Sequence, residues 1–398
     1  MTQTSIQIFL RFLRFGLLAW GGPVAQIAMI KKELVEEEQW VTKEQFNRAL
    51  AVYQALPGPE AHELCVYFGM KAGGRLGGFL AGLAFMLPGF LLMLLFTWIY
   101  ITYSIRSPTV QIVFAGIQAA VIALIVFAAY RIGKHAVTNN RLFLIAVLSG
   151  IAFFAGVNFL IVLIIAGLAF TAWQKRTWWL IVFCTLLFLF FTGWSVYKNG
   201  LNFSIKNKTA KVSATTTINN HEKSNAAVFI TGLKGGLLTF GGAYTAIPFI
   251  REDAVVKNKW ITEEQFLDGI ALSGILPAPL IIFSTFVGYF GGGWWGAIFI
   301  TIGIFLPAFA FTLVGHSVME KLIANKALHN FLDGITAGVM GLIAVTAILL
   351  FASTINSLPA VIIFIIGLMA LIKYRSKYTA MIIIAGAGLL SLLWHNLF

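Results

Sequence analysis

Charged residues and cysteines are both scarce in this chain. Only 11% of its 398 residues are charged, and 15 residues are acidic. A soluble domain carries roughly 25% charged residues, so the shortage excludes an ordinary soluble enzyme, a coiled coil and a disordered chain. Cysteine occurs only as Cys65 and Cys184, each inside an apolar stretch. This excludes a disulfide framework and a thiolate metal site.

Apolar residues dominate what is present. They make up 59% of the chain, with 36 Phe and 38 Gly, and the mean hydropathy is +0.88. These values indicate an all-α polytopic membrane protein. The net charge of +13 would suggest nucleic-acid binding in a soluble protein, but here most cations lie in short connections between apolar runs. Because the positive-inside bias and anionic lipid account for them, we expect membrane lipid and no nucleic acid as partners.

Thirteen apolar segments are candidate spans, although a full span needs about 20 residues. They are 6–30, 46–69, 78–103, 109–130, 142–156, 159–173, 178–197, 226–250, 265–290, 294–318, 331–352, 358–372 and 378–394. Several are short, so we predict about 12–13 transmembrane helices. The first run lacks a basic leader and is interrupted by Arg11 and Arg14, which favours a first helix over a cleaved signal peptide.

The chain divides into two halves that are related in sequence. A stretch rich in Asn, Thr, Ser and Lys is predicted to be a solvated linker, which gives an N-terminal repeat at 1–197, a linker at 198–225 and a C-terminal repeat at 226–398. Gly16–Phe46 aligns without gaps to Gly236–Phe266, with 13 of 31 positions identical. Two later pairs match in the same order: Gln54–Pro59 with Gly274–Pro279, and Phe85–Gly89 with Ile304–Ala308. We therefore expect the halves to share a fold.

The two halves are expected to be inverted repeats. Seven predicted spans precede the linker and six follow it, which places the halves in opposite orientations. Loops after the even-numbered spans carry most of the cations, which puts the N-terminus in the cytoplasm and the C-terminus outside. Two charged segments, the linker and the mixed-charge loop after the first span, do not follow the positive-inside rule, because this topology places them outside.

Gly and Pro interrupt predicted helices at matching positions in the two halves. Broken helices in inverted repeats are typical of secondary transporters, whose substrates bind near the midplane. Pro57 and Gly58 should end one half-helix, and Pro59 suits the start of the next, where free amides and the helix dipole attract an anion. Kinks and close-packing glycines are the alternative. The predicted substrate-binding positions are Gly21, Gly22, Pro23, Pro57, Gly58, Pro59, Gly241, Gly242, Pro277 and Pro279.

Two cations occupy equivalent positions inside the repeats. Arg14 lies two residues before Gly16, and Lys234 lies two residues before Gly236. A charge inside a membrane helix marks a pathway or a partner by default, although a long side chain near a helix end also reaches the interface by snorkelling. We predict that Arg14 and Lys234 line the anion pathway.

A titratable cluster follows the first Pro break. It consists of Glu60, His62 and Glu63, whose counterparts in the second half are the apolar Leu280, Ile282 and Phe283. An acid in the first turn of a half-helix is either a capping group or a proton carrier. We predict Glu60 as the proton carrier and His62 as a second proton-coupling residue, with packing as the alternative for His62.

Enzyme motifs are incomplete or missing in the sequence. His62 and Glu63 open a His-Glu-x-x-His pattern, but Val66 stands where the second zinc ligand is needed. A Gly-x-Ser-x-Gly motif, a Walker A motif and a dinucleotide fingerprint in the required context are absent from the sequence. We therefore predict that the chain is not an enzyme and holds no metal or cofactor.

Five motifs carry a resemblance to a known family. They are Phe15–Ile30, Glu33–Trp40, Leu56–Leu64, Leu276–Phe290 and Ile304–Phe311. Through them the chain resembles the chromate ion transporter (CHR) family in its long, two-domain form. The resemblance implies a multi-pass protein that exports chromate across the bacterial inner (plasma) membrane, uses the proton-motive force and confers chromate resistance. Glu60 falls on the acid of the family's Pro-Gly-Pro-Glu pattern.

Chromate as the substrate is implied by the resemblance alone, whereas the residues by themselves favour an anion carrier. We expect alternating access by a proton antiporter, with the anion held at the helix breaks and by Arg14 and Lys234 while Glu60 exchanges a proton. Chromate is a tetrahedral dianion much like sulfate, so a sulfate or other oxyanion carrier is the alternative. A passive anion channel is a further one. The oligomeric state stays open, a homodimer included.

Overall fold

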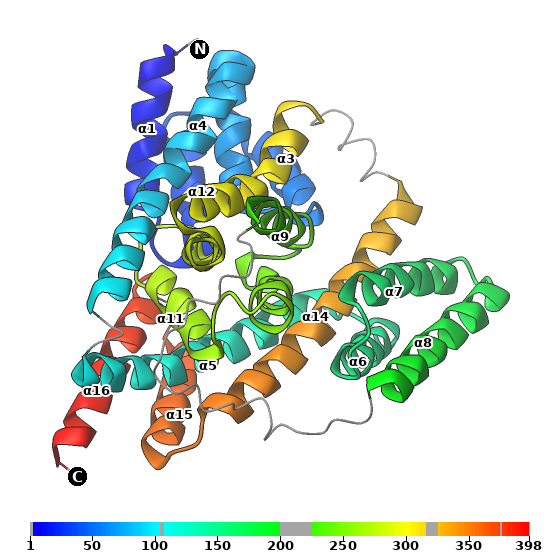
Figure 1. Ribbon diagram of the computed structural model, residues 1–398. Coiled ribbons are helices and arrows are strands. Elements are labelled where there is room, and N and C mark those ends of the chain that lie inside the picture. Colours follow the sequence, from blue (N-terminus) through cyan, green and yellow to red (C-terminus); the bar gives the residue numbers. More distant parts are fainter. Residues whose placement is uncertain (1–2, 104–106, 200–223, 316–324, 375, 398) are drawn as a thin grey trace. The chain divides into compact units, whose positions relative to one another are not determined.

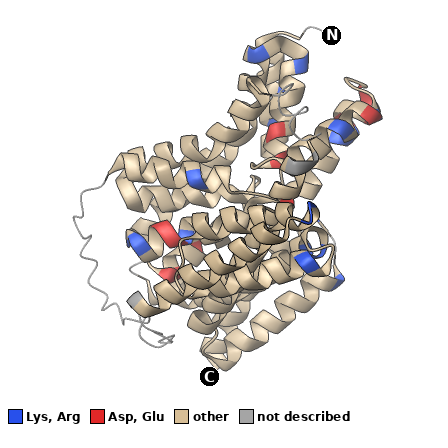
Figure 2. Ribbon diagram, turned by 90° about the vertical axis from the view of Figure 1, so that its right-hand side faces the viewer, with Lys and Arg blue, Asp and Glu red and all other residues tan. Residues whose placement is uncertain are grey.

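A computed structural model of the chain describes residues 3–103, 107–199, 224–315, 325–374 and 376–397 (Figure 1). These residues form helices, and the described ranges contain no β-strand. Apart from its two ends, the predicted linker at 198–225 lies outside the described residues. Charged side chains are few, and most of the ribbon carries none (Figure 2).

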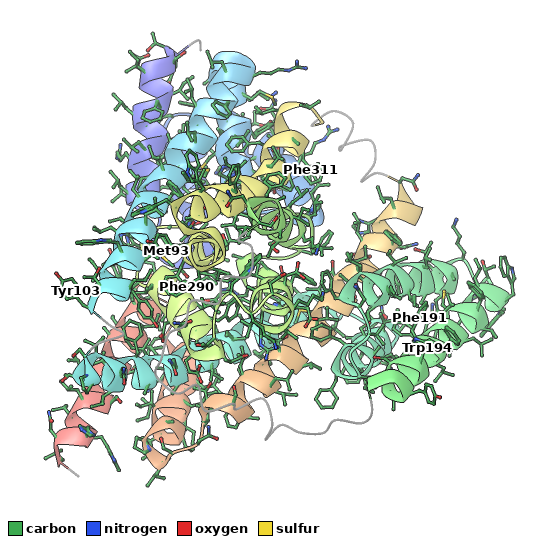
Figure 3. All side chains as sticks on the ribbon, viewed as in Figure 1. Met93, Tyr103, Phe191, Trp194, Phe290 and Phe311 are labelled. Atoms are coloured by element: carbon green, nitrogen blue, oxygen red, sulfur yellow. The ribbon has the colours of Figure 1, made fainter. Side chains whose placement is uncertain are left out.

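Within these ranges, six helices are long and apolar enough to cross a membrane: α4 (Glu60–Tyr103), α5 (Pro108–Ala136), α8 (Trp178–Asn199), α12 (Phe283–Leu313), α14 (Lys326–Thr354) and α16 (Thr379–Leu397). Three shorter apolar helices are α6 (Asn140–Phe154), α7 (Phe159–Gln174) and α15 (Leu358–Lys373). Large apolar side chains such as Tyr103 and Trp194 remain exposed (Figure 3), which suits a lipid-facing surface. The prediction of an all-α polytopic membrane protein is confirmed.

Helix α4 consists of two arms joined by a sharp turn. Gly73 and Gly74 have non-helical backbone angles, with φ of −145° and 63°. A Cβ added at Gly69 would lie 2.4 Å from the carbonyl oxygen of Gly77, although residues eight apart on a straight helix are about 12 Å from each other. The chain therefore reverses at this turn, so that a short arm (60–72) packs against a long arm (75–103). The same turn recurs in α12 at Gly292 and Gly293.

The described helices group into two compact units. The first comprises 1–124, 224–321 and 358–398, and the second comprises 125–223 and 322–357. Each unit thus draws on both sequence halves, and the first contains all of the predicted breaks. In the second unit, Leu142, Phe170 and Ala337 belong to a buried apolar cluster contributed by α6, α7 and α14. The predicted repeats are defined by sequence similarity, whereas these units are defined by contacts. The division into repeats therefore stays a prediction.

Within the first unit, local structure matches at the positions that the repeat alignment pairs. The paired elements are α1 (Ser5–Leu17) with α9 (Asn225–Leu237), the π-helices η1 (Lys32–Glu37) and η4 (Glu252–Lys257), and α3 (Lys43–Ala55) with α11 (Glu263–Gly274). Both α3 and α11 begin with a capping box, in which a Thr at the N-cap and a Gln three residues later bond to each other's backbone. The shared Thr-x-Glu-Gln pattern therefore produces the same type of helix start in both halves.

Glycines let helices of the first unit approach closely. A Cβ added at Gly232 or Gly236 of α9 would lie 2.3 Å from the carbonyl oxygen of Ile300 or Ile304 of α12. Gly16 of α1 faces the long arm of α4 in the same way, since a Cβ added there would lie 2.5 Å from the carbonyl oxygen of Phe85. Small residues at such spacing allow membrane helices to pack backbone to backbone. These contacts fix the helices that flank the breaks.

Candidate substrate site at the helix breaks

The two Pro-containing breaks occur where the sequence predicts them. Helix α3 ends at Ala55 and α4 begins at Glu60, so the segment containing Pro57, Gly58 and Pro59 is not helical. In the second half, α11 ends at Gly274 and a 3-10 helix, η5 (Leu280–Ile282), starts directly after the second Pro-x-Pro. Both segments are buried.

The Gly-Gly positions also interrupt helices. Helix α1 ends at Leu17 and α2 (Gly22–Lys31) begins after Gly21, whose φ is 87°, with Pro23 in its first turn. In the second half, Gly241 and Gly242 have φ of 75° and 121°. They separate α9 from a 3-10 helix, η3 (Ala243–Ala246), which leads into α10 (Ile247–Arg251). All four predicted interruptions are therefore present.

Parts of the two halves meet at these breaks. The backbone N–H of Gly58 donates a hydrogen bond to the carbonyl oxygen of Thr239, at 2.8 Å. Thr239 precedes the second Gly-Gly pair by two residues. The second Pro break contacts the first half as well, because a Cβ on Gly89 of α4 would lie 2.3 Å from Cβ of Ala278. Non-helical backbone from both halves thus gathers inside one compact unit.

The predicted pathway cations form ion pairs within their own halves. Arg14 pairs with Glu33 at 3.2 Å, and its side chain is 63% exposed. Lys234 pairs with Asp253 at 2.8 Å, where the Lys side chain is 34% exposed and the Asp side chain only 3%. Glu33 and Asp253 occupy equivalent positions on the two π-helices. Sequence reasoning missed both acids, although the repeat alignment that paired the cations also pairs them.

A second charged contact fixes the segment after the first π-helix. Arg11 forms an ion pair with Glu38, and Trp40 donates to the same carboxylate from Nε1 at 2.9 Å. Partial burial acts to raise the pKa of Glu38, but the hydrogen bonds from Arg11 and Trp40 outweigh it and hold the pKa below its ordinary value of 4.5. This acid is therefore charged at neutral pH.

The two predicted proton-coupling residues are buried on the short arm of α4. Glu60 is its first residue and is 9% exposed, and His62 is fully buried. The His62 ring lies between two rings of α12, with centroids 4.8 Å from Phe305 and 4.7 Å from Phe309. Neither ring nitrogen has a hydrogen-bond partner in the described part of the chain. These surroundings of His62 are apolar.

Glu63 is a candidate residue that the sequence-based prediction left out. Its side chain is fully buried, and neither carboxyl oxygen has a hydrogen-bond partner within the described ranges. The carboxyl group lies against the backbone of Gly58, where an added Cβ would be 2.8 Å from Oε1. A usable signal was present in the sequence, since a spacing of three residues puts Glu63 on the same helix face as Glu60.

A second buried carboxylate lies in α11. Asp268 is 4% exposed and accepts hydrogen bonds from the hydroxyl of Tyr100 at 2.7 Å and from Nε2 of Gln118 at 2.8 Å. The Tyr100 ring also contacts the ring of Phe290 of α12, with centroids 6.5 Å apart. Unlike Glu63, this acid has a donor on each oxygen, and it joins α11 to α4 and α5.

Metal-ligating side chains are not assembled in the described part of the chain. It contains no group of three or more His, Cys, Asp or Glu residues placed to hold a metal ion. Cys65 and Cys184 are both buried and free.

Buried, discontinuous helices in a polytopic helical protein are typical of membrane transporters that bind substrate at unwound backbone. Residues 6–189 and 226–392 match the family model described as chromate transporter. The chain belongs to this family.

Three relatives align along nearly all of the chain. A chromate transport protein of Pseudomonas aeruginosa is 48% identical over 96% of this chain and 91% of its own length. A chromate transport protein of Cupriavidus metallidurans is 30% identical over 100% of this chain and 94% of its own. A probable chromate transport protein of Synechococcus elongatus is 30% identical over 91% of this chain and 88% of its own. No solved structure matches the chain.

Proposed function

We propose that this protein is a secondary active transporter that exports chromate across the cytoplasmic membrane in exchange for protons, and so confers chromate resistance. The observation that carries the proposal is the 48% identity to a chromate transport protein along 96% of the chain. The buried helix breaks support it, since they offer an oxyanion the backbone amides of helix starts.

In this proposal the anion is held at the breaks of both halves, and the halves act as inverted repeats in alternating access. Glu60 exchanges the proton, with His62 as a second proton-coupling residue, and packing against the apolar rings of α12 is the alternative role for His62. Arg14 and Lys234 reach the anion only after they leave Glu33 and Asp253, because their ion pairs hold them in this conformation. The cations therefore act as pathway residues in a conformation other than the one described.

The membrane potential alone favours loss of a dianion from a cell that is negative inside. One elementary charge crossing 100 mV changes the free energy by about 2.3 kcal/mol. Moving a dianion out of the cell across this potential therefore lowers the free energy by about 4.6 kcal/mol. Export by itself therefore does not distinguish a proton antiporter from a passive channel. A test of coupling has to hold the potential at zero and vary the pH gradient.

The substrate is tested by counterflow in liposomes that contain the purified protein. Liposomes loaded with unlabelled chromate should take up labelled chromate from outside, and protein-free liposomes should not. A tenfold excess of external sulfate should leave most of this uptake in place. Uptake that sulfate abolishes would replace the chromate assignment with a general oxyanion carrier, and no counterflow of either anion would contradict transport.

A further inference from the structure

We propose that Glu63, together with Glu60, carries the proton that the transporter exchanges. The carboxyl group of Glu63 packs against Gly58, and this contact holds it in a buried position. This inference rests on the proposed function and deepens it. It replaces a single acid at the helix start with a pair of carboxyls one turn apart, of which the inner one is sealed from solvent.

Glu63 is buried without a hydrogen-bond partner in the described residues. The side chain is fully enclosed, as are Leu64 and Cys65 beside it, and its two oxygens lack a hydrogen-bond partner within the described residues. An ionised carboxylate buried without a donor or a counter-charge is costly, whereas a neutral acid is tolerated far better. An ionisable residue inside a membrane helix marks a functional site by default, and proton relays are one of the roles that such acids take.

Gly58 has no side chain, and the carboxyl group of Glu63 occupies the space that a side chain there would fill. A Cβ at this position would lie 2.8 Å from Oε1, 3.0 Å from Cδ and 3.4 Å from Oε2 of Glu63. Any side chain on residue 58 would therefore displace the acid. The φ of Gly58 is 150°, a conformation that residues with side chains rarely adopt.

The same glycine links the acid to the other half of the protein. Its N–H bonds to the carbonyl of Thr239, which leads into the second Gly-Gly break. Any movement that separates Thr239 from Gly58 changes the surroundings of Glu63 and admits water or a counter-charge. A proton taken from water on one side is then released to water on the other side when the halves rearrange, which is how a proton is coupled to alternating access.

Another acid, Glu60, is the nearest charged neighbour in the electrostatic surroundings of Glu63. Within the described ranges, Glu60 on the preceding turn is the one charged group that acts on it. The adjoining His62 ring is enclosed by apolar rings of α12, and Lys234 of α9 is bonded to Asp253. A negative charge on either of these two acids disfavours a negative charge on the other, because like charges repel.

The two sequence halves differ at this position. The counterpart of Glu63 in the repeat is Phe283, which is also fully buried. The position is therefore buried in both halves, and only the first half places a titratable group there, against Gly58, whose counterpart is Ala278. A packing role alone is met by an apolar residue, as the second half demonstrates.

The test compares Glu63→Gln with Asp268→Asn in liposomes. Both substitutions replace a buried carboxylate by an amide of the same shape, and Asp268 is the matched control because it has hydrogen-bond donors on both oxygens. Chromate counterflow and proton movement, followed with a pH-sensitive dye, are measured on the same preparation. We expect Glu63→Gln to keep counterflow and to lose at least tenfold in the rate of proton movement driven by a chromate gradient, while Asp268→Asn keeps both.

The outcomes separate this inference from the proposed function. Proton movement in Glu63→Gln equal to that of the unmodified protein would overturn the role of Glu63 and leave chromate transport standing. Absence of chromate flux in the unmodified protein would instead remove the proposed function.

A measurement on the unmodified protein covers the case in which Glu63→Gln does not fold. A hydrophobic carbodiimide reacts with protonated carboxyls in apolar surroundings, and mass spectrometry locates the adduct. We expect modification of Glu63 that declines as the pH rises. Any labelling pattern that lacks Glu63 would overturn the inference.

Discussion

The contact between α9 and α12 allows a matched test of helix packing at two adjacent glycines. A Cβ at Gly236 would lie 2.3 Å from the carbonyl oxygen of Ile304 and 3.0 Å from its carbonyl carbon. These are backbone atoms of α12, so relief requires the two helices to move apart. A Cβ at Gly235 meets only side-chain atoms, of which Cγ1 of Ile250 is 3.3 Å away. We compare Gly236→Ala with Gly235→Ala.

The magnitudes follow from two opposing effects. Replacing Gly by Ala inside a helix stabilises it by about 1 kcal/mol, and this gain is common to both variants. Overpacking a close contact costs about 1–3 kcal/mol, and this cost falls mainly on Gly236→Ala, because the neighbours of Gly235 are side-chain atoms of Ile250 and Ile304 that can shift. The difference between the variants therefore isolates the contact, and we expect Gly236→Ala to be less stable than Gly235→Ala by about 1–3 kcal/mol.

Thermal unfolding of the purified variants in one detergent, at one scan rate, measures this difference. A fixed scan rate is required because membrane proteins of this size often unfold irreversibly. We expect the melting temperature to fall in the order Gly235→Ala, unmodified protein, Gly236→Ala. Equal melting temperatures for the two variants, or the reverse order, would refute the packing of α9 on α12.

Two further predictions concern charge. Lys234→Met leaves the buried Asp253 without its closest cation, so it should destabilise the protein by about 1–3 kcal/mol, less than for a fully buried pair because Lys257 also pairs with Asp253. The exposed pair made by Arg14 is worth about 0–1 kcal/mol, so a thermal shift for Arg14→Met as large as that for Lys234→Met would contradict this ranking. Because the folded pKa of Glu38 lies below 4.5, its stabilisation is present above that pH and is lost as the pH falls through the folded value. The melting temperature difference between the unmodified protein and Glu38→Gln should stay constant above pH 5 and shrink below 4.5, and a difference that grows in acid would count against the ion pair.

Local chemistry made the helix breaks predictable from the sequence. A Pro residue lacks an amide hydrogen and blocks the preceding turn, so two prolines separated by Gly58 disfavour a continuous helix through this segment. The single Pro88 and Pro307, by contrast, lie inside α4 and α12. The capping boxes at Thr42 and Thr262 are likewise determined by residues three positions apart. The reversals at Gly73 and its counterpart agree with the predicted separation of spans, since each lies between two apolar runs.

Contacts distant in sequence account for what the sequence did not predict. The partner of Lys234 lies 19 residues away, and nothing local distinguishes a paired cation from one that lines a pathway. The position of Glu63 against Gly58 depends on how the chain passes through the break, and the bond to Thr239 joins segments of the two halves. Repeat symmetry could have indicated the acids at 33 and 253, because the cations that they bind occur in equivalent positions.

The central claim is coupled chromate export, and chromate uptake into inside-out vesicles tests it most directly. The membrane potential is held at zero with potassium and valinomycin, and an interior-acid pH gradient is imposed. The account predicts that the gradient drives chromate accumulation, that a protonophore abolishes it, and that vesicles lacking the protein do not accumulate chromate. Uptake of equal rate and extent with and without the gradient would contradict proton coupling and leave a passive pathway.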